Sequence, residues 1–226
     1  MERSPTVATI DWGRVAERLS FLFPPVIGVG IVGLVQDVEP GVPGLGYTLV
    51  LIGTIGYTIL TGVMVVTLAV DARAIRSQPS SRTDWRPRPL LYALGALFWA
   101  PAVAVIYLYR RHRRFPTPLG WSKWWIVVFI SLLTTIGGAI SAIVGIVFAT
   151  PELVVTAISV TGIIAVGTFP VAIHQDAAYV AQTSDSWQPN PAGYLGLALL
   201  SLFIPPLQPL LAVYYLIRRR RAIGNV

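Results

Sequence analysis

The side chains that could do acid-base, nucleophilic or metal chemistry are few. The chain has two histidines and no cysteine. His112 lies within an arginine cluster and His174 at the end of an apolar run, without the spacing of a metal site and without a nearby nucleophile. We interpret both as side chains at a membrane interface. The sequence therefore predicts no catalytic residue, no metal site and no cofactor, and it favours a protein that is not an enzyme.

Two aspartates require cationic partners. Asp71 and Asp176 each end an apolar run, where the negative end of a helix disfavours a carboxylate. We expect arginines to pair with them between the two halves of the chain: Asp71 with Arg218 or Arg219, and Asp176 with Arg110 or Arg111. The alternative is a solvated aspartate beside an arginine close to it in sequence.

One pattern of residues occurs twice. Asp-Ala, Trp-x-Pro-x-Pro-x-x-Tyr, a proline-broken apolar run, Tyr-Leu and Arg-Arg follow one another from Asp71 to Arg111, and again from Asp176 to Arg219. An internal repeat of about half the chain predicts a duplicated protein. We place repeat 1 at residues 1–114 and repeat 2 at residues 115–226.

The composition indicates a membrane protein. Hydrophobic residues make up 54% of the chain and charged residues 12%, against about 25% charged in soluble domains. A membrane-spanning helix needs about 17 to 25 apolar residues. Six runs reach that length: 19–35, 45–70, 90–109, 124–149, 153–173 and 194–217. The expected fold class is an all-α integral membrane protein.

The third and sixth runs could either cross the membrane or turn back within it. Basic clusters lie at both ends of the third run, so six straight spans would break the positive-inside rule. The conflict disappears if both runs enter the membrane and return to the same side, each turning at its prolines. The candidate turn or pore residues are Pro101, Pro205, Pro206, Gln208 and Pro209. Six kinked spans, or broken helices lying along the interface, are the alternatives.

The re-entrant arrangement predicts a complete topology. Each repeat has two spans and one proline-broken helical hairpin, and both termini and all basic residues are cytoplasmic. The outer loops are residues 36–46 and 150–152, and residues 115–120 link the halves. Parallel repeats of this kind imply a pseudo-two-fold axis along the membrane normal.

The repeated pattern carries a resemblance. Its Asp-Ala, Trp-x-Pro-x-Pro and Tyr-Leu-Tyr-Arg-Arg-His elements resemble small multi-pass membrane proteins of halophilic archaea. The likeness covers Asp71 to Arg114 most closely. In the second half Ile217 replaces the second tyrosine and no histidine follows. The resemblance implies a membrane location and does not imply an activity.

The charge pattern favours association over chemistry. A net charge of +7 in short clusters beside apolar runs favours contact with the bilayer and anionic lipid headgroups, and not with nucleic acid. The candidate lipid contacts are Arg113, Arg114, Arg220 and Arg221. We expect a non-enzymatic membrane scaffold or complex subunit, with a membrane protein or a second copy as a further partner. The alternative is a channel or transporter for a small solute, with its site at the proline breaks.

The predicted topology can be tested with one cysteine, because the chain has none of its own. In a Thr117→Cys variant, the new thiol between the halves should react with a membrane-impermeant maleimide only after cell lysis. Labelling in intact cells would place residue 117 outside and contradict the re-entrant third run.

Overall fold

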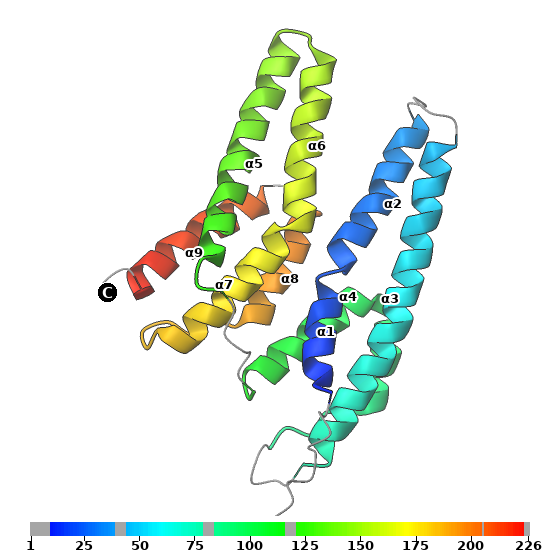
Figure 1. The fold of residues 1–226 in the computed structure, drawn as a ribbon, viewed down its shortest axis with the longest axis vertical. Helices are drawn as coiled ribbons and strands as arrows, with labels where there is room; N and C mark the ends of the chain where they lie inside the picture. Colours follow the sequence, from blue (N-terminus) through cyan, green and yellow to red (C-terminus); the bar gives the residue numbers. More distant parts are fainter. Residues whose placement is uncertain (1–9, 39–43, 79–83, 116–120, 205, 224–226) are drawn as a thin grey trace, which may run out of the picture.

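The computed structural model describes residues 10–38, 44–78, 84–115, 121–204 and 206–223, and these residues form helices without any strand (Figure 1). The helices are α1 (Trp12–Ser20), α2 (Phe23–Val38), α3 (Leu45–Arg76), α4 (Pro89–His112), α5 (Trp124–Val147), α6 (Pro151–Gly167), α7 (Phe169–Thr183), α8 (Pro191–Ser201) and α9 (Leu207–Ile223). The all-helical class expected from the sequence is confirmed. The link at 116–120, Pro205 and most of the first outer loop lie outside the described residues.

Five helical stretches are long and apolar enough to cross a membrane: Trp12–Leu34, Leu45–Arg76, Pro89–His112, Trp124–Val147 and Pro151–Thr183. Two long antiparallel pairs, α2 with α3 and α5 with α6, extend from the rest of the molecule in Figure 1. Their outward side chains are large and apolar, such as Ile59 on α3 and Ile143 on α5. Lipid would cover such surfaces.

Helix α4 is long enough for a span but folds back on itself. Its backbone leaves the helical conformation at Trp99 (φ −154°, ψ 81°). In a continuous helix Tyr92 and Tyr107 would be about 22 Å apart, whereas their ring centroids are 4.8 Å apart. Arg110 Nη1 also donates to Tyr92 Oη at 3.2 Å. Each arm of about ten residues rises about 15 Å, roughly half of the ~30 Å hydrocarbon core.

The sixth apolar run is also a helical hairpin. Its arms are α8 and α9, and the rings of Tyr194 and Tyr215 on the two arms are 5.0 Å apart. Pro206 lies in the turn before α9, whereas Pro101 and Pro209 lie at the start of the return arms. Pro101 follows the break at Trp99, and Pro209 lies in the first turn of α9. Proline is tolerated in a first turn because that N–H has no helical partner.

The helix ends meet on one side of the molecule. Arg111, near the end of α4, contacts both Asp11, which caps α1, and Asp71, in the last turns of α3. Arg219, near the end of α9, donates to the carbonyl of Ser122 just before α5. We call this side the arginine face. It holds the starts of α1 and α5 and the C-terminal ends of α3, α4 and α9.

The contacts between the halves differ from the expected symmetry. Within each half the same packing occurs: α1 on α3 and α4 in the first, α5 on α7 and α9 in the second. Between the halves the main contacts join α2 to α6 and α4 to α8. The α8 contacts are made by Val105 and Tyr109 on the second arm of α4, which corresponds to α9 and not to α8. Each contact therefore joins non-equivalent parts, and the halves meet head to tail. The expected pseudo-two-fold relation is therefore not supported by these contacts.

Small residues let two of the spans approach closely. A Cβ at Gly138 would collide with Thr161, and one at Gly145 would lie 2.7 Å from Val154 Cγ2. These glycines place α5 directly on α6, the use expected of small residues spaced along membrane helices.

The folded-back shape of α4 predicts a specific disulfide. A Cβ at Gly95 would lie 3.2 Å from Val103 Cγ2, so a variant with Gly95→Cys and Val103→Cys should oxidise to an intramolecular disulfide and lose maleimide labelling. In a straight helix these positions would be about 12 Å apart, beyond the reach of a disulfide. The matched control is Leu51→Cys with Ile59→Cys, at the same spacing on the uninterrupted helix α3. Oxidation of both pairs, or of neither, would contradict the hairpin.

Candidate functional site

A buried carboxylate joins the return arm of α4 to the span before it. Asp71 Oδ2 accepts a hydrogen bond from Tyr107 Oη at 2.6 Å and another from Arg111 Nε at 3.1 Å. The aspartate lies on α3, and both donors lie on the second arm of α4. A charge removed from water is tolerated only with such charge-assisted partners. We call these three residues the first triad.

The second half contains the same arrangement. Asp176 Oδ2 accepts from Tyr215 Oη at 2.7 Å and from Arg219 Nε at 2.7 Å. The Asp176 side chain is 0% exposed. This second triad joins α9 to α7 as the first joins α4 to α3.

These partners correct the expected ion pairs between the halves. Asp71 and Asp176 each bind an arginine of their own half, Arg111 and Arg219. Folding back places each return arm against its own preceding span, which brings the local arginine within reach. The other expected arginines contact aromatic residues of their own half: Arg110 donates to the Tyr92 hydroxyl, and Arg218 lies over the ring of Trp187.

Aromatic rings cover both triads. The tryptophan of each Trp-x-Pro-x-Pro segment and the tyrosine that follows it pack against the triad tyrosine. The ring centroids are 5.4 Å apart for Trp85–Tyr107, 4.8 Å for Tyr92–Tyr107, 5.6 Å for Trp187–Tyr215 and 5.0 Å for Tyr194–Tyr215. The repeated sequence pattern therefore encodes a carboxylate, its two donors and their aromatic cover.

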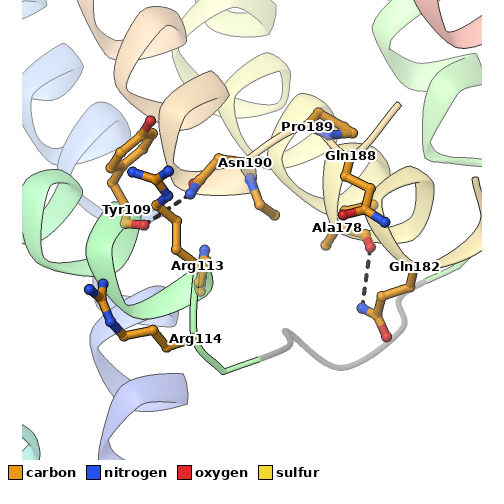
Figure 2. A pocket seen from close by; sticks show the side chains of 11 residues that line it. Tyr109, Arg113, Arg114, Ala178, Gln182, Gln188, Pro189 and Asn190 are labelled. Carbon is orange, nitrogen blue, oxygen red and sulfur yellow. Dashed lines mark hydrogen bonds between the residues drawn. The ribbon is translucent and has the colours of Figure 1, made fainter. Parts of the chain in front are cut away.

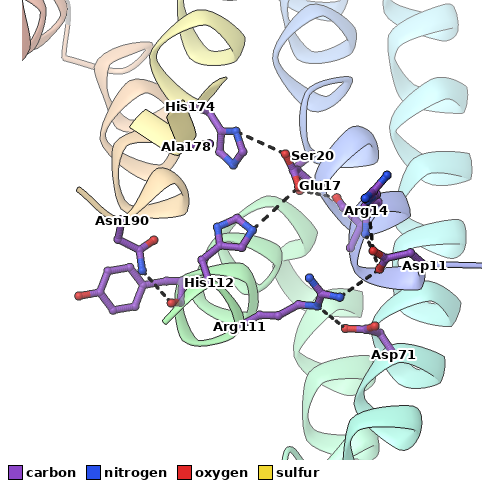
Figure 3. Close-up of polar contacts among 12 residues, drawn as sticks. Asp11, Arg14, Glu17, Ser20, Asp71, Arg111, His112, His174, Ala178 and Asn190 are labelled. Atoms are coloured by element: carbon purple, nitrogen blue, oxygen red, sulfur yellow. Dashed lines mark hydrogen bonds and ion pairs between the residues drawn. The ribbon is translucent and has the colours of Figure 1, made fainter. Parts of the chain in front are cut away.

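A different polar group forms between the halves. Glu17 of α1 lies between His112, at the end of α4, and His174 of α7 (Figure 3). Glu17 Oε2 is 4.0 Å from His112 Nε2, and Oε1 is 3.6 Å from His174 Nδ1. The histidine side chains are 2% and 0% exposed and that of Glu17 is 9% exposed. The two imidazole centroids are 5.6 Å apart.

This group corrects the interpretation of both histidines as interfacial side chains. They are buried, and they face each other across a carboxylate that the sequence did not single out. The three residues lie far apart along the chain, so no local spacing could reveal them. The only sequence signal was the presence of three ionisable residues beside or within apolar runs.

Arg111, which lies next to His112 in the chain, pairs with carboxylates other than Glu17. Arg111 lies between Asp11 and Asp71, with Nη2 3.0 Å from Asp11 Oδ1, as Figure 3 shows. The Arg111 guanidinium, which lies near Glu17, is therefore paired with two other carboxylates, Asp11 and Asp71.

A polar cavity of about 600 Å³ opens on the arginine face between the halves. Its wall includes the end of α4, the end of α7 and the segment that leads into α8 (Figure 2). Arg113 extends toward Tyr109 and Asn190, and its guanidinium lies over the Tyr109 ring. Asn190 caps α8 and donates to the Tyr109 carbonyl at 2.9 Å, which fixes α8 to α4. His112 lines the same cavity.

The predicted lipid contacts are all on the surface. Arg113, Arg114, Arg220 and Arg221 are exposed. Arg114 lies 3.5 Å from Asp84 and over the Trp85 ring. In each arginine cluster one side chain, Arg111 or Arg219, is therefore bound in a triad, and the other arginines face outward.

The second triad predicts an order of stabilities. Asp176→Ala leaves the largely buried Arg219 without its carboxylate and should cost about 3 to 5 kcal/mol. Tyr215→Phe removes one hydrogen bond to a charged group and should cost about 1.5 to 3 kcal/mol. Thermal unfolding of the full chain in detergent, followed by tryptophan fluorescence, measures both. Asp185→Ala, at an exposed aspartate, is the control, and an equal loss in that variant would contradict a special role for Asp176.

The arginine face therefore carries three polar features: two buried triads, a histidine–glutamate group between the halves, and an arginine-lined cavity beside that group. Comparisons with protein-family models, with curated proteins and with solved structures found no match to this chain.

Proposed function

We propose that the chain is a non-enzymatic integral membrane protein that binds anionic phospholipid headgroups on its arginine face. The observation that carries this proposal is the division of the arginine clusters. Arg111 and Arg219 are neutralised inside the protein. Among the residues that the structure describes, no carboxylate pairs with the exposed Arg113, Arg220 or Arg221. Each such charge near an anionic membrane surface contributes about 1 kcal/mol of attraction.

The cavity supports the same function. Arg113 and Arg114 lie on its wall together with the exposed amide of Gln188. Helix α8 begins at the cavity, and the positive end of its dipole faces it. Arginine donors with a helix N-terminus favour a phosphate group. A lipid headgroup at this position would lie between the two halves of the protein.

We also propose that the halves are parallel repeats and that both termini are cytoplasmic. The matched triads and their aromatic cover support the duplication. The orientation rests on the basic residues near the membrane, which concentrate on the cytoplasmic side of membrane proteins.

The channel or transporter alternative receives less support. A solute site at the proline breaks requires those breaks to face a shared interior. Large side chains beside the breaks face outward, since Phe98 is 89% exposed and Phe203 is 64% exposed, although Pro101 is buried. Gln208 is buried, but it lies in only one of the two hairpins. These surfaces suit contact with lipid tails.

Lipid preference can be measured directly. The full chain is reconstituted in vesicles, and quenching of its tryptophans by brominated phosphatidylglycerol is compared with quenching by brominated phosphatidylcholine. The variant Arg113→Gln with Arg114→Gln should reduce the preference for the anionic lipid about fivefold per arginine, given about 1 kcal/mol for each charge. High salt should weaken the wild-type preference.

The matched control is Arg73→Gln with Arg76→Gln, which removes the same charge from exposed arginines outside the cavity. A smaller loss in the control supports a site in the cavity. An unchanged preference for anionic lipid in the Arg113 and Arg114 variant would overturn the proposal. If the variant keeps its lipid preference but loses a protein that co-purifies with the wild type, the arginines bind a protein partner.

A further inference from the structure

The histidine–glutamate group is not explained by the repeated structural pattern. Each half contains one triad, the aromatic rings that cover it and one hairpin. His112 and His174 are not repeated: the position matching His112 is Arg220, and the position matching His174 is Ala69, as the repeated motifs align. The pattern shared by the halves therefore does not require either imidazole, and their burial together needs a separate explanation.

Their hydrogen-bonding capacity is unused in the protein. In the described part of the chain, neither nitrogen of His112 and neither nitrogen of His174 has a hydrogen-bond partner. A buried polar group without a partner costs about 1 to 3 kcal/mol. The distances of 3.6 and 4.0 Å to the Glu17 oxygens are too long for hydrogen bonds.

Protons alone do not resolve this arrangement. If both imidazoles were protonated, two positive charges would lie in a buried space with centroids 5.6 Å apart, and the single carboxylate of Glu17 could neutralise only one of them. If one imidazole were protonated, it would neutralise Glu17 and leave the other imidazole without a partner. If both were neutral, a protonated Glu17 could donate to only one of their nitrogens. A divalent cation satisfies all three side chains, because it binds neutral imidazole nitrogen and carboxylate oxygen at once.

The donor set matches a transition metal. The ligand atoms of the three side chains lie within 4.8 Å of one another. Four-coordinate Zn²⁺ with bonds of about 2.1 Å has ligand atoms about 3.4 Å apart. The separations between ligand atoms therefore need to shrink by at most about 1.4 Å. Two imidazoles and one carboxylate form a set that Zn²⁺ accepts with one position left open.

The surroundings are compatible with a bound cation. Three positive groups lie near Glu17: Arg14, Arg18 and Arg111. Two of them are paired with carboxylates, since Arg111 lies between Asp11 and Asp71 and Arg14 is 3.3 Å from Asp11. Phe21 packs edge-on against the His174 ring at 5.1 Å and limits its rotation. Since His112 also lines the cavity, an ion could reach the group from the arginine face.

We propose that Glu17, His112 and His174 bind one divalent transition-metal ion, with Zn²⁺ as the expected occupant. The ion joins α1 and α4 of the first half to α7 of the second, so it ties the two halves together. Among the described residues, neither imidazole has a supporting hydrogen bond on its other nitrogen. Such supports strengthen metal sites 10- to 100-fold, so we expect weaker affinity than that of structural zinc sites.

The test uses the full chain in neutral detergent, purified through a tag without histidine and freed of metal with a chelator. Zn²⁺ alone is then titrated, and Co²⁺ is used as a spectroscopic probe. We expect one Zn²⁺ per chain and the intense visible absorption of four-coordinate Co²⁺. His112→Ala, His174→Ala and Glu17→Gln should each weaken Zn²⁺ binding at least about 100-fold, because loss of a ligand costs more than loss of a supporting group. The control Glu152→Gln, at an exposed carboxylate of α6, should bind as the wild type does.

Melting temperatures measured in the chelator show whether each variant folds. If an alanine variant melts below the wild type, His112→Gln or His174→Asn takes its place. The proposal is overturned if Co²⁺ with the wild type keeps the spectrum of the hydrated ion, or if a variant lacking both imidazoles binds Zn²⁺ as tightly as the wild type. Since no anionic lipid is present, failure of metal binding leaves the lipid proposal untouched.

Discussion

The burial of one carboxylate in each half is the constraint on which the rest of the structure depends. A buried charge is tolerated only when it is paired and hydrogen-bonded. Asp71 and Asp176 receive both partners from the arm that follows the proline break. An arm that continued across the membrane would carry its tyrosine and arginine away from the aspartate. The triads therefore select the returning path for both hairpins.

The returning arms explain how short helices are stable beside long ones. An arm of about ten residues cannot cross the hydrocarbon core, and its end would expose backbone groups to lipid. Here the arm rests on the preceding span through its triad and through rings such as Tyr92 on Tyr107. Pro101 and Pro209 contribute by starting the return arms, where a missing N–H has no cost.

The two halves share their internal design but differ where they meet. Their contact joins the return arm of α4 to α8, with Asn190 bonded to the Tyr109 carbonyl. Because this contact is head to tail, it creates one junction and not a symmetric pair. The arginine-lined cavity and the histidine–glutamate group both lie at that junction. The triads occur in both halves, whereas the candidate sites are formed by residues that differ between the halves.

Much of this protein could be predicted from the sequence, because apolar length and the position of arginines are local properties. They identified the helical membrane class, the location of the proline breaks and the aspartates that need cationic partners. The choice of partners could not be predicted. Asp71 binds Arg111 and not an arginine of the other half, because the direction of the return arm decides which guanidinium is near. Glu17, His112 and His174 show the same limit: their residue types were visible in the chain, but only the packing of three helices from two halves brings them together.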